Sequence, residues 1–278
     1  MHRNAPAFAC NTYAYTISHP ATDCLSNLAD FGFSKFELMM YPGHLWPPET
    51  NAAERKALRR LIENRGLMIT TLNMPNIDMN IAAAATEMRR YTLDLLRQIV
   101  ELAGDLEAPG IVIGPGKANP LFPAPREQLT GYFYSALDEL GPLAEKAGTA
   151  LWLENMPFAF IADIEGLMAA LDDYGNDEIG IVFDAANSHF IGEDLGDALR
   201  RCGRRLKLVH LSDTNRQVYR HDPIGEGTVP FEELPGALAE IGYTRLPMLE
   251  IISQDADRDI LSSTDKLTAL GFGRARAA

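Results

Sequence analysis

Four side chains that could bind a hard or borderline metal ion stand at the ends of short apolar segments in the second half of the chain. The segments read LWLE, IVFD, LVH and MLE, and they end at Glu154, Asp184, His210 and Glu250. Each side chain follows a hydrophobic run that we expect to be buried. An ionised carboxylate is very costly to bury without a partner, so such groups are usually paired or bound to a metal.

The composition of this set indicates a catalytic site for one divalent ion. Three carboxylates and one imidazole suit Mn²⁺ or Mg²⁺ best, with Co²⁺ and Zn²⁺ as alternatives, and they do not suit a metal that prefers thiolates. An ion with six positions would keep two of them for a substrate that chelates through adjacent oxygens. The alternative is four unrelated polar residues satisfied by their neighbours, which is less favoured for four in succession.

The elements that must position these residues alternate regularly between short apolar runs and longer amphipathic stretches. The predicted strands are Phe8–Tyr13, Lys35–Met39, Met68–Asn73, Gly110–Gly114, Ala150–Asn155, Ile179–Asp184, Leu206–Leu211 and Pro247–Ile251. Helical periodicity is clearest in Asn51–Arg65, Ala83–Gly104, Arg126–Gly148 and Phe231–Gly242. Three helices reach a glycine just before the next strand, which is the usual left-handed stop: Gly66, Gly148 and Gly242.

This alternation predicts a single (β/α)₈ barrel, an α/β fold of the TIM-barrel type, with residues 1–278 as one domain. Eight strand–helix units favour closure of a parallel sheet. An open dinucleotide-binding sheet would carry a glycine-rich loop after its first strand, whereas CNTYAYTISHP contains no glycine. In a barrel the C-terminal ends of all strands share one face, so the four candidate ligands should meet there.

Composition excludes several classes of partner and location. The formal net charge of −13 disfavours a nucleic-acid partner, because such binding needs clustered Lys and Arg to neutralise phosphates. Three cysteines without a CxxC pair fit a reducing compartment. The N-terminal segment lacks the apolar core of a secretion signal, and no apolar run approaches membrane-spanning length. We therefore expect a soluble, cytoplasmic protein with no membrane partner.

Several segments resemble the xylose-isomerase-like barrel superfamily, and the resemblance covers most of the chain. They read ENMP, FDAANSHF, VHLSDTNRQVYRHDPIGEGTVPF and LEI. That superfamily includes sugar and sugar-phosphate isomerases and epimerases, hydroxypyruvate isomerase, dehydratases and abasic-site endonucleases. The resemblance implies the same four metal ligands. It also implies that Glu154 and Glu250 are catalytic, because the corresponding glutamates of the epimerases both bind metal and move protons.

The chain departs from the endonuclease branch at positions where those enzymes carry further metal ligands. Asn73, Gly114 and Asn187 stand where the nuclease pattern has histidine. Tyr219 replaces an aspartate two residues before His221, which leaves that histidine without its companion ligand. A three-metal phosphodiesterase centre should therefore not assemble, and we rank the abasic-site endonuclease last.

Four further residues are candidates for substrate binding: Asn187, His189, Arg216 and His221. Arg216 matches a family arginine that contacts substrate oxygens, although a surface arginine is the alternative. The two histidines could contact substrate or support the metal ligands. Glu37 should be an inward hydrogen-bonding group with a structural role. The epimerases also carry a second carboxylate six residues after the first, where this chain has Phe160.

The preferred function is a divalent-metal-dependent sugar or keto-sugar isomerase or epimerase that transfers a proton through an enediolate. A metal-dependent lyase or dehydratase shares the first step and is the alternative. The partner would be a small carbohydrate, and phosphorylated substrates stay open because Lys117 alone is a weak phosphate signal. Relatives of this type often pair, so we expect a homodimer or homotetramer.

Overall fold

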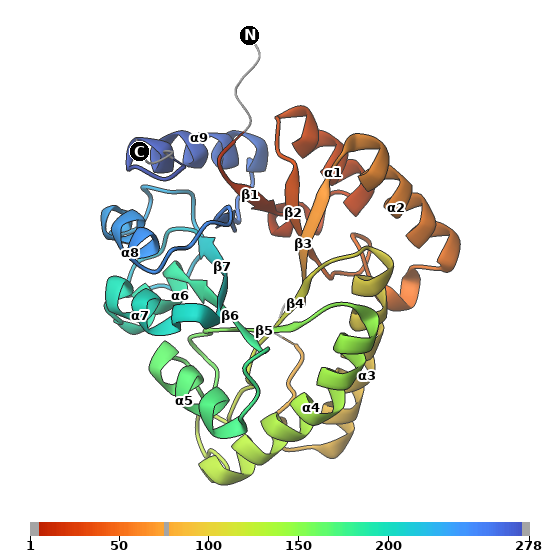
Figure 1. The fold of residues 1–278 in the computed structure, drawn as a ribbon, viewed down its shortest axis with the longest axis vertical. Helices are drawn as coiled ribbons and strands as arrows, with labels where there is room; N and C mark the ends of the chain where they lie inside the picture. Colours follow the sequence, from red (N-terminus) through yellow and green to blue (C-terminus); the bar gives the residue numbers. More distant parts are fainter. Residues whose placement is uncertain (1–5, 75–77, 274–278) are drawn as a thin grey trace.

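The computed structural model describes residues 6–74 and 78–273. Within these ranges, eight parallel strands close into a barrel in chain order, and Figure 1 shows them arranged in a ring. They are β1 (Ala9–Asn11), β2 (Lys35–Met39), β3 (Met68–Asn73), β4 (Gly110–Ile113), β5 (Leu151–Glu154), β6 (Gly180–Asp184), β7 (Leu206–Leu211) and β8 (Met248–Leu249). The predicted single (β/α)₈ barrel is confirmed.

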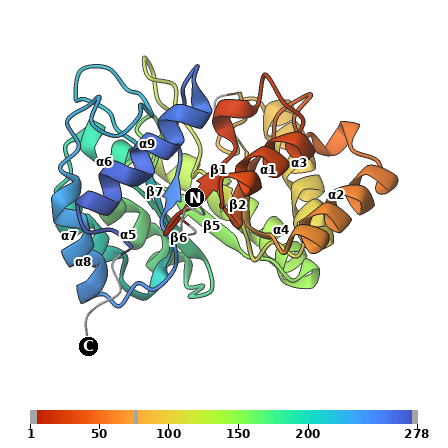
Figure 2. The ribbon, with the colours of Figure 1, turned by 90° about the horizontal axis from the view of Figure 1, so that it is seen from above.

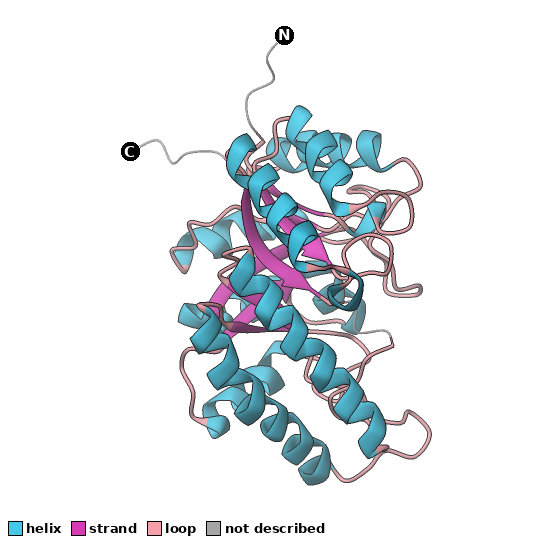
Figure 3. Ribbon diagram, turned by 90° about the vertical axis from the view of Figure 1, so that its right-hand side faces the viewer, coloured by secondary structure: helices cyan, strands magenta, loops and turns pink. Residues whose placement is uncertain are grey.

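Helices surround the strands on the outside of this barrel (Figure 3). They are α1 (Ala21–Asp30), α2 (Ala52–Arg65), α3 (Thr86–Asp105), α4 (Arg126–Ala147), α5 (Ile164–Tyr174), α6 (Ala185–Ile191), α7 (Leu195–Cys202), α8 (Leu234–Glu240) and α9 (Ala256–Ala269). Asp257 in α9 accepts hydrogen bonds from Tyr15 and from Asn27 of α1, at 2.7 and 2.9 Å. These bonds tie the last helix to the first one across β1 (Figures 1 and 2). No helix in the described part of the chain is long and apolar enough to span a bilayer.

Most element boundaries agree with the sequence prediction, and the differences have local causes. β1 ends at Asn11, two residues early, because the Asn11 Oδ1 atom accepts the Tyr13 backbone N–H at 2.6 Å and the chain turns into a 3₁₀ helix. The helix predicted over Phe231–Gly242 is divided into a 3₁₀ turn at Phe231–Glu233 and α8. A proline within the first two positions of α8 suits a helix start better than a helix interior.

The barrel interior has an apolar layer beneath the site. Its members come from six strands: Ala9, Val112, Trp152, Val182, Leu208 and Met248. Side chains on a strand return to the same face every second residue. The residues two positions further along five of these strands therefore form the next layer: Asn11, Glu154, Asp184, His210 and Glu250. An apolar plug thus closes the barrel directly below a layer of polar and ionisable groups.

The plug makes a prediction about Gly110 at the start of β4. A Cβ atom there would lie 2.5 Å from two carbons of the Trp152 indole, so Gly110→Ala must displace the largest member of the layer. We expect a loss of about 1–3 kcal/mol in the free energy of unfolding, measured by chemical denaturation. The control is Gly131→Ala in α4, where the added carbon meets nothing within 4 Å. It should be neutral or stabilise by up to about 1 kcal/mol. If the Gly110→Ala variant and the parent unfolded at the same denaturant concentration, that result would contradict this packing.

Candidate functional site

The four predicted metal ligands converge at the C-terminal end of the barrel. One ligand atom of each lies within 4.8 Å of the others, and all four side chains are buried. The Nδ1 atom of His210 is at the centre of the group. It lies 2.8 Å from Glu154 Oε1, 3.2 Å from Glu250 Oε2 and 3.8 Å from Asp184 Oδ2. The strands bring them together because Asp184 pairs with His210 across β6 and β7, while β5 and β8 flank this pair.

Two carboxylates of this group each present one oxygen that lacks a hydrogen-bond partner among the described residues. These atoms are Asp184 Oδ2 and Glu250 Oε2. The other oxygen of each is already held, since Asp184 Oδ1 accepts the Asn187 backbone N–H at 2.6 Å and Glu250 Oε1 accepts Asn11 Nδ2 at 3.2 Å. A buried, unpaired carboxylate oxygen is costly. Two of them beside one imidazole nitrogen fit a divalent cation that prefers oxygen and imidazole ligands.

The protonation of these groups reflects their burial. Burial raises the pKa of Glu154 and of Glu250 to about 7, although the neighbouring His210 opposes the shift. Burial likewise raises the pKa of Asp184 to about 6. For His210, burial disfavours the charged form, but the surrounding carboxylates outweigh it and raise the pKa well above the usual value. Without a cation the group therefore shares protons near neutral pH, and a cation must displace them.

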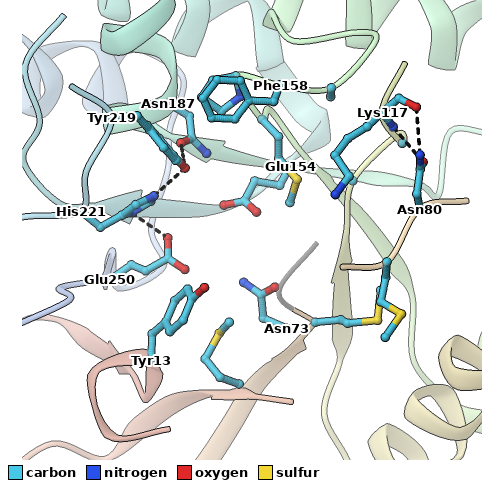
Figure 4. Close-up of a pocket in the computed structure, with 18 of the residues that line it drawn as sticks. Tyr13, Asn73, Asn80, Lys117, Glu154, Phe158, Asn187, Tyr219, His221 and Glu250 are labelled. Atoms are coloured by element: carbon cyan, nitrogen blue, oxygen red, sulfur yellow. Dashed lines mark hydrogen bonds and ion pairs between the residues drawn. The ribbon is translucent and has the colours of Figure 1, made fainter. Parts of the chain in front are cut away.

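His221 belongs to a hydrogen-bonded chain beside the ligands (Figure 4). Its Nδ1 atom lies 2.8 Å from Ser212 Oγ and 3.4 Å from Glu250 Oε2. Its Nε2 atom lies 2.7 Å from the Tyr219 hydroxyl, which donates to Asn187 Oδ1 at 2.7 Å. The residue that replaces the aspartate of the nuclease pattern, Tyr219, is therefore a hydrogen-bond partner of His221.

The other two predicted substrate-binding residues lie outside the described lining of the main pocket. His189 is buried and its Nε2 atom lies 2.8 Å from Thr228 Oγ1, while its Nδ1 atom has no hydrogen-bond partner among the described residues. Arg216 is exposed. Burial lowers the pKa of His189, and the charge of Arg216 lowers it further. Their contact with substrate stays a prediction.

A pocket of about 410 Å³ opens above Glu154 and Glu250. Figure 4 shows the carboxyl groups of these two side chains close together, with Tyr13 and Asn73 below them in the view. The apolar part of the pocket lining is rich in methionine and consists of Met39, Met74, Met79, Ile81, Met156 and Phe158.

Lys117 reaches into the pocket from the loop after β4 (Figure 4). Asn80 clamps this loop, because its side chain accepts from the Lys117 backbone N–H at 2.8 Å and donates to the Lys117 carbonyl at 2.9 Å. Phe160, the residue at the position of the second family carboxylate, instead packs against the hydrophobic core. The loop clamp fixes where the lysine enters the pocket.

Sequence reasoning missed the polar residues that the first three strands contribute. Asn11 contacts Glu250, and Asn73 and Tyr13 line the pocket. Asn73 ends a predicted apolar strand, so the signal that marked the four ligands was present there too, whereas Asn11 lies inside the predicted strand Phe8–Tyr13. The signal was weaker because amide side chains are poor candidates for metal ligation. Glu37 points inward as predicted, and the contact of its Oε1 atom with His210 Nε2 at 3.1 Å is an addition that only the closed barrel reveals.

Comparison with known proteins places these observations in a family. The sequence profile of the xylose isomerase-like TIM barrel matches residues 25–270. A protein without an assigned function from Methanocaldococcus jannaschii is 27% identical over 236 residues, which are 82% of this chain and 78% of that protein. Fructoselysine 3-epimerase from Shigella flexneri is 22% identical over 251 residues, which are 88% of this chain and 89% of the enzyme.

Solved structures share the fold. The crystal structure of a D-tagatose 3-epimerase-like protein superimposes with a TM-score of 0.80 at 23% identity, covering 95% of this chain and 96% of that one. The profile match spans most of the barrel and includes all four residues of the buried ligand group. The chain therefore belongs to the xylose isomerase-like TIM barrel family.

Proposed function

We propose that this protein is a divalent-metal-dependent isomerase or epimerase of a sugar or keto-sugar. The observation that carries the proposal is the buried group of Glu154, Asp184, His210 and Glu250, with two unpaired carboxylate oxygens at the base of an open pocket. The fructoselysine 3-epimerase and the D-tagatose 3-epimerase-like protein among its relatives support a carbohydrate substrate. We assign one ion to each chain, with Mn²⁺ or Mg²⁺ favoured by the oxygen-rich ligands.

The two glutamates are suited to move a proton between the faces of a substrate carbon. They come from β5 and from the residue after β8, and their carboxyl groups lie close together at the base of the pocket (Figure 4). A bound divalent ion would polarise the carbonyl of the substrate and stabilise an enediolate. One glutamate then removes the proton from the carbon next to the carbonyl, and the other delivers a proton to the opposite face. Asp184 and His210 hold the ion only.

The surrounding residues would orient the substrate. His221 and Asn187 border the pocket with their hydrogen bonds fixed by Tyr219, so they present a rigid polar edge. We retain His189 and Arg216 as proposed substrate contacts. Phosphorylated substrates are included because the Lys117 side chain enters the pocket. A lyase or dehydratase would use the same residues for its first step, so product analysis must separate the two reactions.

Metal binding should be stoichiometric and should depend on pH. The ligand carboxyl groups have pKa values raised to about 6 or 7, so they must lose protons when a cation binds. Affinity for Mn²⁺ should rise by about tenfold or more from pH 5.5 to 7.5. Calorimetry in two buffers of different ionisation enthalpy would detect the released protons, and elemental analysis should find one ion per chain. Two or three tightly held ions per chain, or an affinity independent of pH, would count against this site.

Amide substitution should separate proton transfer from metal binding. Glu154→Gln and Glu250→Gln keep the side-chain size and one coordinating oxygen but remove the base. Turnover should fall by about 10²–10⁴-fold while Mn²⁺ still binds, more weakly. The measurement is exchange of solvent deuterium into candidate ketoses, with mass spectrometry for any dehydrated or cleaved product.

The matched control for these variants is Glu240→Gln, because Glu240 is an exposed residue of α8 that pairs with Arg200, and neither residue lines the pocket. This variant should exchange deuterium at the parent rate. If both active-site variants also turned over at the parent rate with metal bound, the two-glutamate mechanism would be wrong. A dehydrated product in place of an epimer would move the assignment to the lyase class.

A further inference from the structure

We propose that Glu37 is a positioning residue that orients the His210 imidazole for metal binding; the inference rests on the metal site proposed above. Glu37 is completely buried in β2, on the far side of His210 from the three ligand carboxylates. Its contacts assign it a specific task within the site, beyond filling space in the barrel.

The two nitrogens of His210 face different partners. Nδ1 faces Glu154, Asp184 and Glu250, whose oxygens lie 2.8–3.8 Å away. Nε2 faces Glu37, with its two oxygens at 3.1 and 3.3 Å. A carboxylate on Nε2 keeps the proton on that nitrogen, so the lone pair is left on Nδ1. The ring is therefore presented to the three ligand carboxylates with its metal-binding atom forward.

Glu37 is itself fixed by three neutral donors from the flanking strands. Asn11 Nδ2 donates to Oε1 at 2.5 Å, Thr71 Oγ1 donates to Oε2 at 2.6 Å, and Asn73 Nδ2 donates to Oε1 at 3.1 Å. Strand register produces this arrangement, since Asn11 pairs with Glu37 and Glu37 pairs with Thr71. Hydrogen bonds to the ionised form favour a charged carboxylate even where burial opposes it. The barrel thus holds a fixed negative charge behind His210.

The same network reaches a second ligand. Asn11 Nδ2 also lies 3.2 Å from Glu250 Oε1, so one amide group contacts both Glu37 and Glu250. This contact occupies one oxygen of Glu250 and leaves Oε2 as the unpaired atom beside His210 Nδ1. Glu37 and Asn11 together therefore orient two of the four ligands, while Glu37 stays outside the ligand group itself.

If Glu37 acts through its charge, the Gln and Asp variants should rank in one order of metal affinity, and if it acts through its shape, they should rank in the opposite order. Glu37→Gln preserves the volume and most hydrogen-bonding atoms but removes the charge. Glu37→Asp preserves the charge but shortens the side chain and leaves a gap. If Glu37 only fills space, the Gln variant should bind metal better than the Asp variant. If its charge orients and strengthens the His210 ligand, the Asp variant should bind metal better than the Gln variant.

The test is a calorimetric Mn²⁺ titration of the full chain at pH 7.5. Removal of the carboxylate that supports a ligating histidine typically weakens metal binding by about 10–100-fold, and we expect that loss for Glu37→Gln. Glu37→Asp should recover part of it, and Glu240→Gln should match the parent. Thermal unfolding of the metal-free proteins shows whether each variant is folded. Should Glu37→Gln fail to fold, Thr71→Val removes one donor to Glu37 at nearly constant shape and should weaken Mn²⁺ binding several-fold.

The outcomes separate this inference from the proposed reaction. The inference is overturned if a folded Glu37→Gln variant binds Mn²⁺ as tightly as the parent, and the same holds for Thr71→Val where that variant is used. It is also overturned if Glu37→Gln binds Mn²⁺ more tightly than Glu37→Asp. If the parent binds Mn²⁺ but exchanges no substrate proton, the proposed reaction fails, and weak binding by Glu37→Gln still supports the role of Glu37. If the parent binds none of Mn²⁺, Mg²⁺, Co²⁺ and Zn²⁺, both proposals are wrong.

Discussion

Four carboxylates share one buried layer of the barrel with a single central imidazole. Glu37, Glu154, Asp184 and Glu250 all lie within hydrogen-bonding or near-contact distance of His210. Charges at such distances in a dry interior repel strongly, and one protonated histidine cannot balance four anions. The apolar layer below gives them no access to water from that side. The four carboxylates are stable at these distances only when protons or a cation balance their charge. The surrounding residues must therefore accommodate both the protonated and the cation-bound state.

The sequence predicted well that these four side chains would meet, because the signal is local. Each ligand interrupts an apolar strand with a charged or imidazole side chain, and barrel geometry then gathers the ends of β5 to β8. The support beneath His210 was harder to predict. Asn11 and Thr71 are ordinary strand residues in the sequence, and their contact with Glu37 depends on register between strands that lie 24 or more residues apart. Such cross-strand pairing is set by the closed barrel and leaves no local pattern.

The loop after β7 shows how a substitution can reassign a position. Tyr219 and Asn187 occupy places where the nuclease pattern requires ligands, and in this chain they bond to each other. Their hydrogen bonds engage His221 through Nε2 and leave its other nitrogen near Glu250. Residues that would otherwise recruit further metal ions therefore form a neutral edge of the pocket. This edge is consistent with the single ion and the small substrate that we propose.

The methionine-rich lining of the pocket has a consequence for the range of molecules that the pocket can hold. Thioether side chains are unbranched and polarisable, so they fill irregular spaces and adapt to different neighbours at low cost. Met39, Met74, Met79 and Met156 all line the pocket, whereas hydrogen bonds and strand register hold the polar side chains rigid. Selectivity should therefore be stringent for the atoms at the reacting end and permissive for the remote substituent. A pocket with rigid polar residues and an adaptable methionine-rich lining can accept a different substrate after a few substitutions in that lining, while the residues at the reacting end stay the same.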